Sequence, residues 1–428
     1  MLNVLDLRGV AGDLAGRLPR PDLAGEGPVT EVRKILADVR SHGDEALRRL
    51  TARFDGADID SLAVGREEAS AALARLPGEL ASALEQAAGR IRRFHEHRPA
   101  PEAPFSADGV TVSVRQIPVE RAGVYVPGGR AKYPSSVLMT AIPPKVAGVG
   151  AVAICVPPGR DGRLPDEVLA AAVLAEVDEI YRVGGAQAIG ALAYGTESVP
   201  AVDVIVGAGS RIVSLAKQEV RGLVGVPAAF AGPSEVVVVA DETVPAMAAA
   251  LDLVVQAEHG PDGLAWLVTW SEEALSRISA LVAEIVSSSP RRAEIESTLE
   301  EGGYAVLVEG PEQAMEVANA IAPEHLELCC AGASGLVELV RHAGAVFVGP
   351  HSPASLGDYY AGPSHVLPTF RSARFSSVLG VEDFLRRVHV IEATESGLAT
   401  AAPAVAAIAR AEGLDAHARS VLERGHHG

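Results

Sequence analysis

The chain has 428 residues, of which 48% are apolar and 21% charged, and these values are typical of a globular protein with more than one domain. Lysine and arginine number 37 against 55 acidic residues, and the net charge of −18 argues against nucleic acid and anionic membranes as partners. No CxxC spacing exists among the three cysteines, so we expect neither a disulfide framework nor a thiolate zinc site. The first residues make a poor signal peptide, and no apolar stretch is long enough for a membrane span, so we expect a cytoplasmic protein.

The N-terminal part of the chain is predicted to be helical. Apolar residues recur at helical spacing over 31–56, with a break at Gly43, and again over 80–97. A proline-rich stretch at 99–105 then interrupts the pattern.

From about residue 120 the pattern changes to short apolar strands that alternate with alanine-rich helices. The predicted strands are 151–156, 180–183, 202–206, 236–240, 264–269, 305–308 and 345–349. The predicted helices between them are 166–176, one after 185, 244–258, 272–287 and 312–321. Strands separated by helices of roughly 10–15 residues indicate βαβ units. The predicted fold class is therefore α/β, with two Rossmann-like parallel-sheet domains and small helical N-terminal and C-terminal extensions.

The segment QAEH at 256–259 is a candidate metal site. If the preceding helix continues through it, Gln256 and His259 lie on one face and can grip one ion. The alternative is a helix end with solvated polar groups, because glutamine is an uncommon zinc ligand and two ligands are too few.

The segment APEHLE at 322–327 is a candidate for proton transfer. Pro323 predicts the first turn of a new helix, which would place Glu324 and His325 at a helix N-terminus. That position would lower the pKa of both groups, since it favours the carboxylate and the neutral imidazole. The alternative is that Glu324 merely complements the helix dipole.

Two further segments carry chemistry-bearing residues. The loop 357–365 follows a predicted strand, and Asp358 and His365 in it are either ligands or ordinary turn residues. Glu412 and His417 lie in the C-terminal tail, where a solvated helix surface is the alternative.

Two glycine-bearing turns, at 183–187 and 206–210, could present backbone amides to a pyrophosphate. Neither turn matches G-x-G-x-x-G, so each is a weak dinucleotide signal. The residues alone predict a two-sheet α/β protein and leave the reaction open.

Taken together, the segments resemble histidinol dehydrogenases over nearly the whole chain. The most specific matches are PGGRAKYPSSVLM from residue 127, APEHLEL at 322–328 and the HVLPT loop from His365. GGAQAIGALAYGTESVPAVDVIVGAG at 184–209, AGPSEVVVVAD at 231–241, QAEHGPDG at 256–263 and EGLDAHARSV at 412–421 extend the resemblance in the same order.

The resemblance implies an enzyme of histidine biosynthesis that oxidises L-histidinol through L-histidinaldehyde to L-histidine with two NAD. It implies one zinc ion per subunit, held by Gln256, His259, Asp358 and His417. The last ligand would come from the partner subunit of a homodimer with shared active sites. The metal would position the substrate's imidazole and amino nitrogens.

The resemblance also assigns the other site residues. Glu324 and His325 would transfer protons, and Ser234, His365 and Glu412 would contact the substrate beside His325 and the four zinc ligands. Tyr125, Gln187 and Ser210 match positions that contact NAD. Ser210 departs from the family, which commonly has an asparagine there.

The predicted domains follow from the pattern and the resemblance together. We expect an N-terminal extension over 1–23 and a C-terminal tail over 379–428 that contributes to the partner subunit's active site. Between them, 24–127 and 236–378 would form a discontinuous Rossmann-like domain with the zinc and proton-transfer residues, and 128–235 a second one.

Three alternatives are weighed against this function. A paralogue could oxidise another amino or sulfonated alcohol, but it should differ at the substrate-contacting residues. A zinc hydrolase using Glu324 as base would not explain the residues that match NAD contacts. A binding protein without activity would not need both Glu324 and His325.

Overall fold

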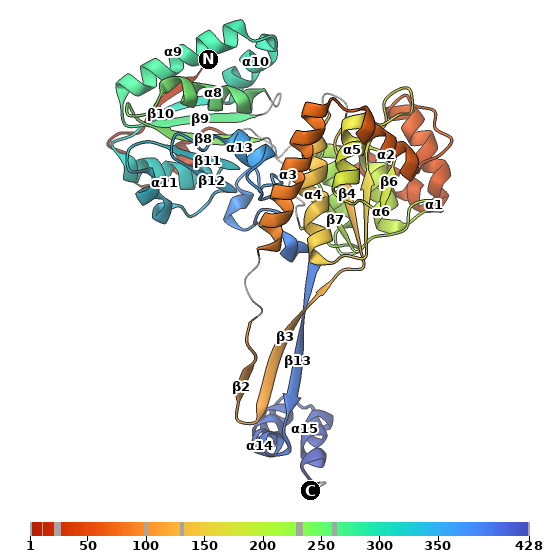
Figure 1. Ribbon diagram of the computed structural model, residues 1–428. Coiled ribbons are helices and arrows are strands. Elements are labelled where there is room, and N and C mark those ends of the chain that lie inside the picture. Colours follow the sequence, from red (N-terminus) through yellow and green to blue (C-terminus); the bar gives the residue numbers. More distant parts are fainter. Residues whose placement is uncertain are drawn as a thin grey trace. The chain divides into compact units, whose positions relative to one another are not determined.

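The computed structural model describes residues 2–10, 12–20, 27–97, 102–128, 132–227, 234–258 and 263–426 (Figure 1). The chain divides into two units, of which the larger comprises Met1–Glu96 with Glu120–Asp383 and the smaller His97–Val119 with Phe384–Gly428. Within these described ranges, no helix combines the length and apolar character that crossing a bilayer requires.

The first sheet of the larger unit, called sheet A, has six parallel strands in the order β1-β10-β9-β8-β11-β12. Its strands are β1 (Asn3–Asp6), β8 (Glu235–Ala240), β9 (Leu264–Thr269), β10 (Gly303–Leu307), β11 (His325–Cys329) and β12 (Ala345–Val348). On one side of β8, β9 and β10 follow in chain order. On its other side lie β11 and β12, so the direction of the strand order reverses between β8 and β11.

Helices cover both faces of sheet A because its strands are apolar on both sides. One face packs against α8 (Ala246–Ala257), α9 (Glu272–Ser288) and α10 (Arg292–Gly302) (Figure 1). The other face packs against α11 (Pro311–Ile321), α12 (Ala333–Leu336) and the N-terminal segment with η1 (Ala15–Arg17). The short helices η2 (Val337–Leu339) and α13 (Ala354–Tyr359) flank β12 in the chain.

The second sheet, sheet B, has four parallel strands in the order β6-β5-β4-β7. Its strands are β4 (Arg121–Tyr125), β5 (Ala151–Cys155), β6 (Glu179–Tyr181) and β7 (Val204–Val206). Its helices are α1 (Val29–Phe54), α2 (Arg66–Arg75), α3 (Gly78–Glu96), α4 (Pro134–Ala147), α5 (Asp166–Leu174), α6 (Gly185–Tyr194) and α7 (Arg211–Val220). The order reverses between β4 and β7 here, so both sheets have a topological switch point.

The larger unit ends with two short helices, η3 (Ser372–Arg374) and η4 (Val381–Phe384). The smaller unit is an antiparallel sheet of β2 (Phe105–Ala107), β3 (Val110–Pro118) and β13 (Leu385–Ala393), followed by α14 (Glu395–Ala411), α15 (Asp415–Leu422) and η5 (Glu423–His426). The two α-helices pack through small side chains, with Ala406, Ala409 and Ala418 buried between them.

The predicted α/β class with two parallel sheets is confirmed, but the assignment of segments to the sheets needs correction. β1 lies inside the predicted extension 1–23 and pairs with β10 in sheet A. β4 and α1 lie inside the predicted segment 24–127, yet β4 pairs within sheet B and the apolar stripe of α1 packs on that sheet and α6. The predicted tail 379–428 contains β13 as well as helices.

Candidate active site

The residues predicted to act in the reaction lie at two sheet edges of the larger unit. Glu324 and His325 lie at the amino ends of the strands of sheet A. Tyr125, Gln187 and Ser210 lie at the carboxyl ends of the strands of sheet B. We call these places the amino edge of sheet A and the carboxyl edge of sheet B.

The prediction that Pro323 begins a helix is wrong. Helix α11 ends at Ile321, Ala322 takes a left-handed conformation with φ 53°, and β11 begins at His325. A proline directly after a helix C-cap cannot continue that helix. The residues that follow alternate between the two faces, since Leu326 packs on the α11 side and His325 faces the α8 side.

His325 is a buried imidazole between two carboxyl groups. It is 6% exposed, its Nε2 lies 3.4 Å from Oδ1 of Asp358, and its Nδ1 lies 3.9 Å from Oε2 of Glu324. Burial lowers the pKa of His325, but Glu324 and Asp358 together raise it by more, so the net shift is upward. The predicted lowering of this pKa is therefore wrong, because carboxylates and not a helix N-terminus surround the ring.

Glu324 is oriented by groups from distant segments, which were not among the predicted site residues. Its Oε2 accepts a hydrogen bond of 3.2 Å from the backbone N–H of Glu235, the first residue of β8. The Glu235 side chain is fully buried and pairs with Arg20 at 3.4 Å. Arg20 also donates to the carbonyl oxygens of Ala320 and Ile321, and so it fixes the end of α11 from which Glu324 follows.

Asp358 and His365 come from a segment that returns to the amino edge of sheet A. The prediction placed this segment beyond the carboxyl ends of the strands, but α13 follows β12 and brings Asp358 back to His325. His365 Nδ1 lies 3.0 Å from the carbonyl oxygen of Asp358, and its Nε2 lies 3.1 Å from Oγ of Ser136 on α4. The structure therefore brings Glu324, His325, Asp358 and His365 together.

The remaining predicted zinc and substrate residues are placed less completely. Gln256 lies in the last turn of α8, is 4% exposed, and has a buried Nε2 without a hydrogen-bond partner. His259 lies outside the described residues, and Ser234 directly precedes β8. Glu412 and His417 are exposed side chains of the smaller unit.

These residues fit a zinc ion with nitrogen and oxygen ligands. Zinc binds a carboxamide through its oxygen, and the buried Nε2 of Gln256 is a donor that an acceptor atom of the substrate would satisfy. Gln256 therefore offers a carboxamide oxygen, and Asp358 offers a carboxylate beside the imidazole of His325.

The carboxyl edge of sheet B fits a dinucleotide. Tyr125 ends β4, and its hydroxyl accepts a hydrogen bond of 3.2 Å from the Gly185 backbone N–H. Gln187 is 1% exposed, and both polar atoms of its side chain lack partners. Gly207 has φ +106°, and a Cβ there would collide with the Tyr125 carbonyl oxygen, so only glycine lets the turn after β7 approach β4. Ser210 follows as the N-cap residue of α7.

A buried lysine lies behind the same turn. Lys217 of α7 is 2% exposed, and its Nζ donates to the Gly207 carbonyl oxygen at 2.9 Å. Burial lowers the pKa of Lys217 to about 8. The turn that a pyrophosphate would approach is thus fixed by glycine on one side and by an amino group on the other.

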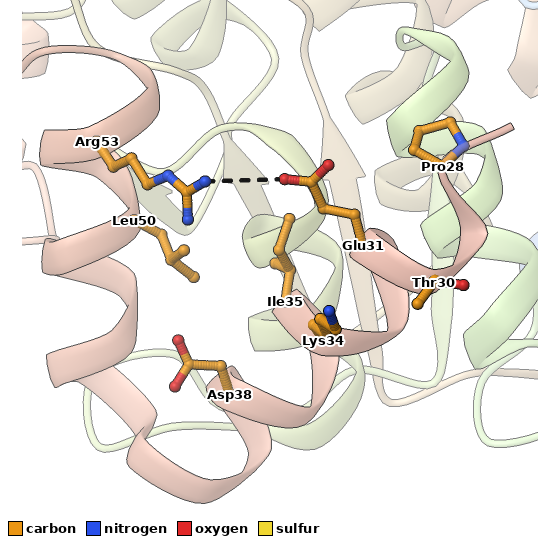
Figure 2. Close-up of a pocket in the computed structure, with 8 residues that line it drawn as sticks. All are labelled: Pro28, Thr30, Glu31, Lys34, Ile35, Asp38, Leu50 and Arg53. Atoms are coloured by element: carbon orange, nitrogen blue, oxygen red, sulfur yellow. Dashed lines mark ion pairs between the residues drawn. The ribbon is translucent and has the colours of Figure 1, made fainter.

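A groove of about 540 Å³ lies along α1. Figure 2 shows Glu31 and Arg53 pointing toward each other across it, 3.9 Å apart. Its lining residues are Pro28, Thr30, Glu31, Lys34, Ile35, Asp38, Leu50 and Arg53. None of them is a predicted site residue, so we assign no chemistry to this groove.

Comparison with known proteins identifies the family. The family model described as histidinol dehydrogenase matches residues 19–425. The chain is 48% identical to the histidinol dehydrogenase of Gluconobacter oxydans over 92% of each chain, and 47% identical to that of a Synechococcus strain over 92% of this chain and 91% of the relative. A crystal structure of histidinol dehydrogenase from Elizabethkingia anophelis superposes with a TM-score of 0.94 at 32% identity, covering 99% of this chain and 98% of that one. The chain belongs to the histidinol dehydrogenase family.

Proposed function

We propose that this protein oxidises L-histidinol to L-histidine in two successive steps at the amino edge of sheet A, with L-histidinaldehyde kept bound between them. The observation that carries the proposal is the buried group of Glu324, His325 and Asp358, with Asp358 Oδ1 3.4 Å from the imidazole. Membership of the family supports the choice of substrate.

In the first oxidation, His325 accepts the proton of the substrate hydroxyl at one of its ring nitrogens. The neutral imidazole is the form that can do this, and Asp358 and Glu324 then stabilise the imidazolium that results. NAD, bound at the carboxyl edge of sheet B, supplies the hydride acceptor for each oxidation. Tyr125, Gln187 and Ser210 are the residues that would hold it.

The second oxidation requires water to add to the aldehyde before another hydride can leave. Glu324 removes a proton from this water, and the hydrogen bond from the Glu235 backbone keeps its carboxylate oriented. Because Glu324 and His325 are both less than 10% exposed, bulk water is largely kept from the aldehyde between the steps.

Zinc would be held by Gln256, His259, Asp358 and His417, the last from the partner subunit of a homodimer. Its contribution when bound is to fix the imidazole and amino nitrogens of the substrate. Ser234, His365 and Glu412 would contact the substrate around it. The exposure of Glu412 and His417 on the smaller unit supports a contribution to a partner's site.

The experiment that tests the proposed function is a count of NADH formed for each L-histidinol consumed. We expect two NADH and one L-histidine, with no free aldehyde detected by a carbonyl-trapping reagent. One NADH per substrate, or release of the aldehyde as the main product, would contradict the proposed two-step reaction.

A further inference from the structure

Two carboxyl groups that the proposed reaction does not use lie farther from the amino edge of sheet A than His325 does. They belong to Asp252 of α8 and Glu327 of β11, and Glu327 is fully buried. Ligand atoms of the two carboxyl groups lie within 4.8 Å of each other. Two carboxylates can only accept hydrogen bonds, so a hydrogen bond between these side chains requires a proton on one of them. Burial raises the pKa of both groups, which keeps that proton in place.

Glu327 also reaches a third element. Its Oε1 accepts a hydrogen bond of 2.8 Å from the backbone N–H of Ala354, the first residue of α13. The Cys329 Sγ lies 4.0 Å from its Oε2. One buried side chain therefore connects α8, β11 and the start of α13.

Each of these three elements carries a proposed site residue a short step toward the amino edge of sheet A. Gln256 follows Asp252 by about one helical turn, and Asp358 follows Ala354 by about one turn. His325 precedes Glu327 by two residues, so both side chains leave the same face of β11. Fixing the contacts of Asp252 and Glu327 therefore fixes the positions from which the site residues project.

A metal site is the other reading of this cluster. Ligand atoms of Asp252, Glu327 and Cys329 all lie within 4.8 Å of one another. However, one oxygen of Glu327 already accepts from a backbone amide, and a proton shared between the two carboxyl groups would use one oxygen of each. Burial raises the pKa of the Cys329 thiol to about 12, and its S–H lies within reach of a weak hydrogen bond to Oε2 of Glu327, at 4.0 Å. Internal hydrogen bonding accounts for these contacts without an ion.

We propose that Asp252 and Glu327 form a positioning pair, which ties α8, β11 and α13 together so that Gln256, His325 and Asp358 converge. The inference rests on the proposed function, since it takes Gln256 and Asp358 as zinc ligands. The pair touches neither substrate nor metal and acts only through the elements that it joins.

The test compares a variant that keeps the hydrogen bonds with one that removes them. In Glu327→Gln, the carboxamide oxygen can still accept from Ala354 and its NH₂ can donate to the Asp252 carboxylate. The double variant Asp252→Leu/Glu327→Met removes both carboxyl groups together, so no unpaired charge is left buried. The matched control is Asp241→Leu, because Asp241 is a buried carboxylate that accepts from the Ala331 N–H at the opposite edge of sheet A.

The readouts are the zinc dissociation constant, measured by competition with a chromophoric chelator, and amide hydrogen exchange over 354–358. We expect the double variant to bind zinc about 10- to 100-fold more weakly, the usual effect of removing groups that orient metal ligands. Exchange over 354–358 should rise in the same variant. Glu327→Gln should match the parent in both measurements, and Asp241→Leu should leave the zinc affinity unchanged.

Parental zinc affinity and parental exchange in the double variant would overturn the positioning role, and so would a Glu327→Gln variant as impaired as the double variant. Asp358→Ala separates this inference from the proposed function. If it loses zinc while the double variant keeps it, only the positioning role is wrong. If it keeps zinc, the proposed ligand set is wrong, and the exchange over 354–358 then decides the positioning role by itself.

Discussion

The amino edge of sheet A and the carboxyl edge of sheet B are built in different ways. At sheet A, charged side chains meet in a buried space, and each is oriented by another polar group, as Glu324 is by the backbone of Glu235. At sheet B, backbone conformation shapes the edge, because Gly207 lets the turn after β7 approach Tyr125. Proton transfer requires acid and base side chains in a fixed orientation. Binding of a dinucleotide instead requires backbone amides that can come close to its phosphates.

Metal removal should produce the largest difference between the two edges. We expect a chelator to abolish oxidation of L-histidinol and added zinc to restore it, because the proposed ligands Gln256 and Asp358 serve the edge of sheet A alone. NAD affinity, measured by fluorescence titration, should stay at the parental value. Full activity in protein verified to be metal-free would contradict the proposed role of zinc.

Replacement of His325 should have the next largest effect. His325→Asn keeps a polar side chain but removes the base that accepts a hydroxyl proton from the alcohol in the first step and from the hydrated aldehyde in the second, so both half-reactions should slow by about 100- to 10,000-fold. Rates with supplied L-histidinol and supplied L-histidinaldehyde measure the two steps separately. Zinc content and NAD affinity serve as controls and should be unchanged, and a parental rate for the alcohol would refute the role of His325.

A change at Gly207 should affect the other edge. Gly207→Ala places a methyl group against the Tyr125 carbonyl oxygen, so the turn must move and NAD should bind about 10-fold more weakly or worse, a cost of 1.4 kcal/mol or more. Gly222→Ala is the matched control, since Gly222 has a similar φ of +102° but nothing within 4 Å of its Cβ. Equal losses of NAD affinity in the two variants would show that backbone strain, not contact with Tyr125, is responsible.

The smallest expected effect is an increase in NAD affinity on replacement of Ser210. Ser210 makes no side-chain cap hydrogen bond to α7, so Ser210→Asn should introduce a longer polar side chain without breaking an existing contact. One added hydrogen bond to NAD is worth about 0.5–1.5 kcal/mol, so the dissociation constant should fall by about 2- to 10-fold. Isothermal titration measures it, and weaker binding would mean that this position does not face the cofactor.

Much of the fold could be predicted from the sequence because the buried strands are uninterrupted apolar runs. β9 and the strands on either side of it in the chain were predicted within two or three residues of their observed bounds. β13 was missed because its sequence, LRRVHVIEA, alternates only briefly between apolar and polar residues and precedes alanine-rich helices.

The site was predicted only in part, for a different reason. Glu324 and His325 were candidates from the residues themselves and received their predicted roles by resemblance, but the helix expected at Pro323 proved to be a strand, which changed the electrostatic surroundings of His325. The groups that orient them, such as Arg20 and Glu235, come from distant segments and were not found. The sequence did offer a signal for the buried glutamates, because each lies in an otherwise largely apolar strand. The strand sequences are EVVVVA for Glu235 and HLELC for Glu327.

Glu324 is proposed to take a proton only in the second half-reaction and His325 in both, and the ratio of the two half-reaction rates in Glu324→Gln tests this directly. The amide cannot take a proton from water, so oxidation of supplied L-histidinaldehyde should fall by about 100- to 10,000-fold. Formation of the first NADH from L-histidinol in a single turnover should stay close to the parental rate, because His325 is intact. A variant that oxidises the aldehyde at the parental rate would contradict this account of the active site.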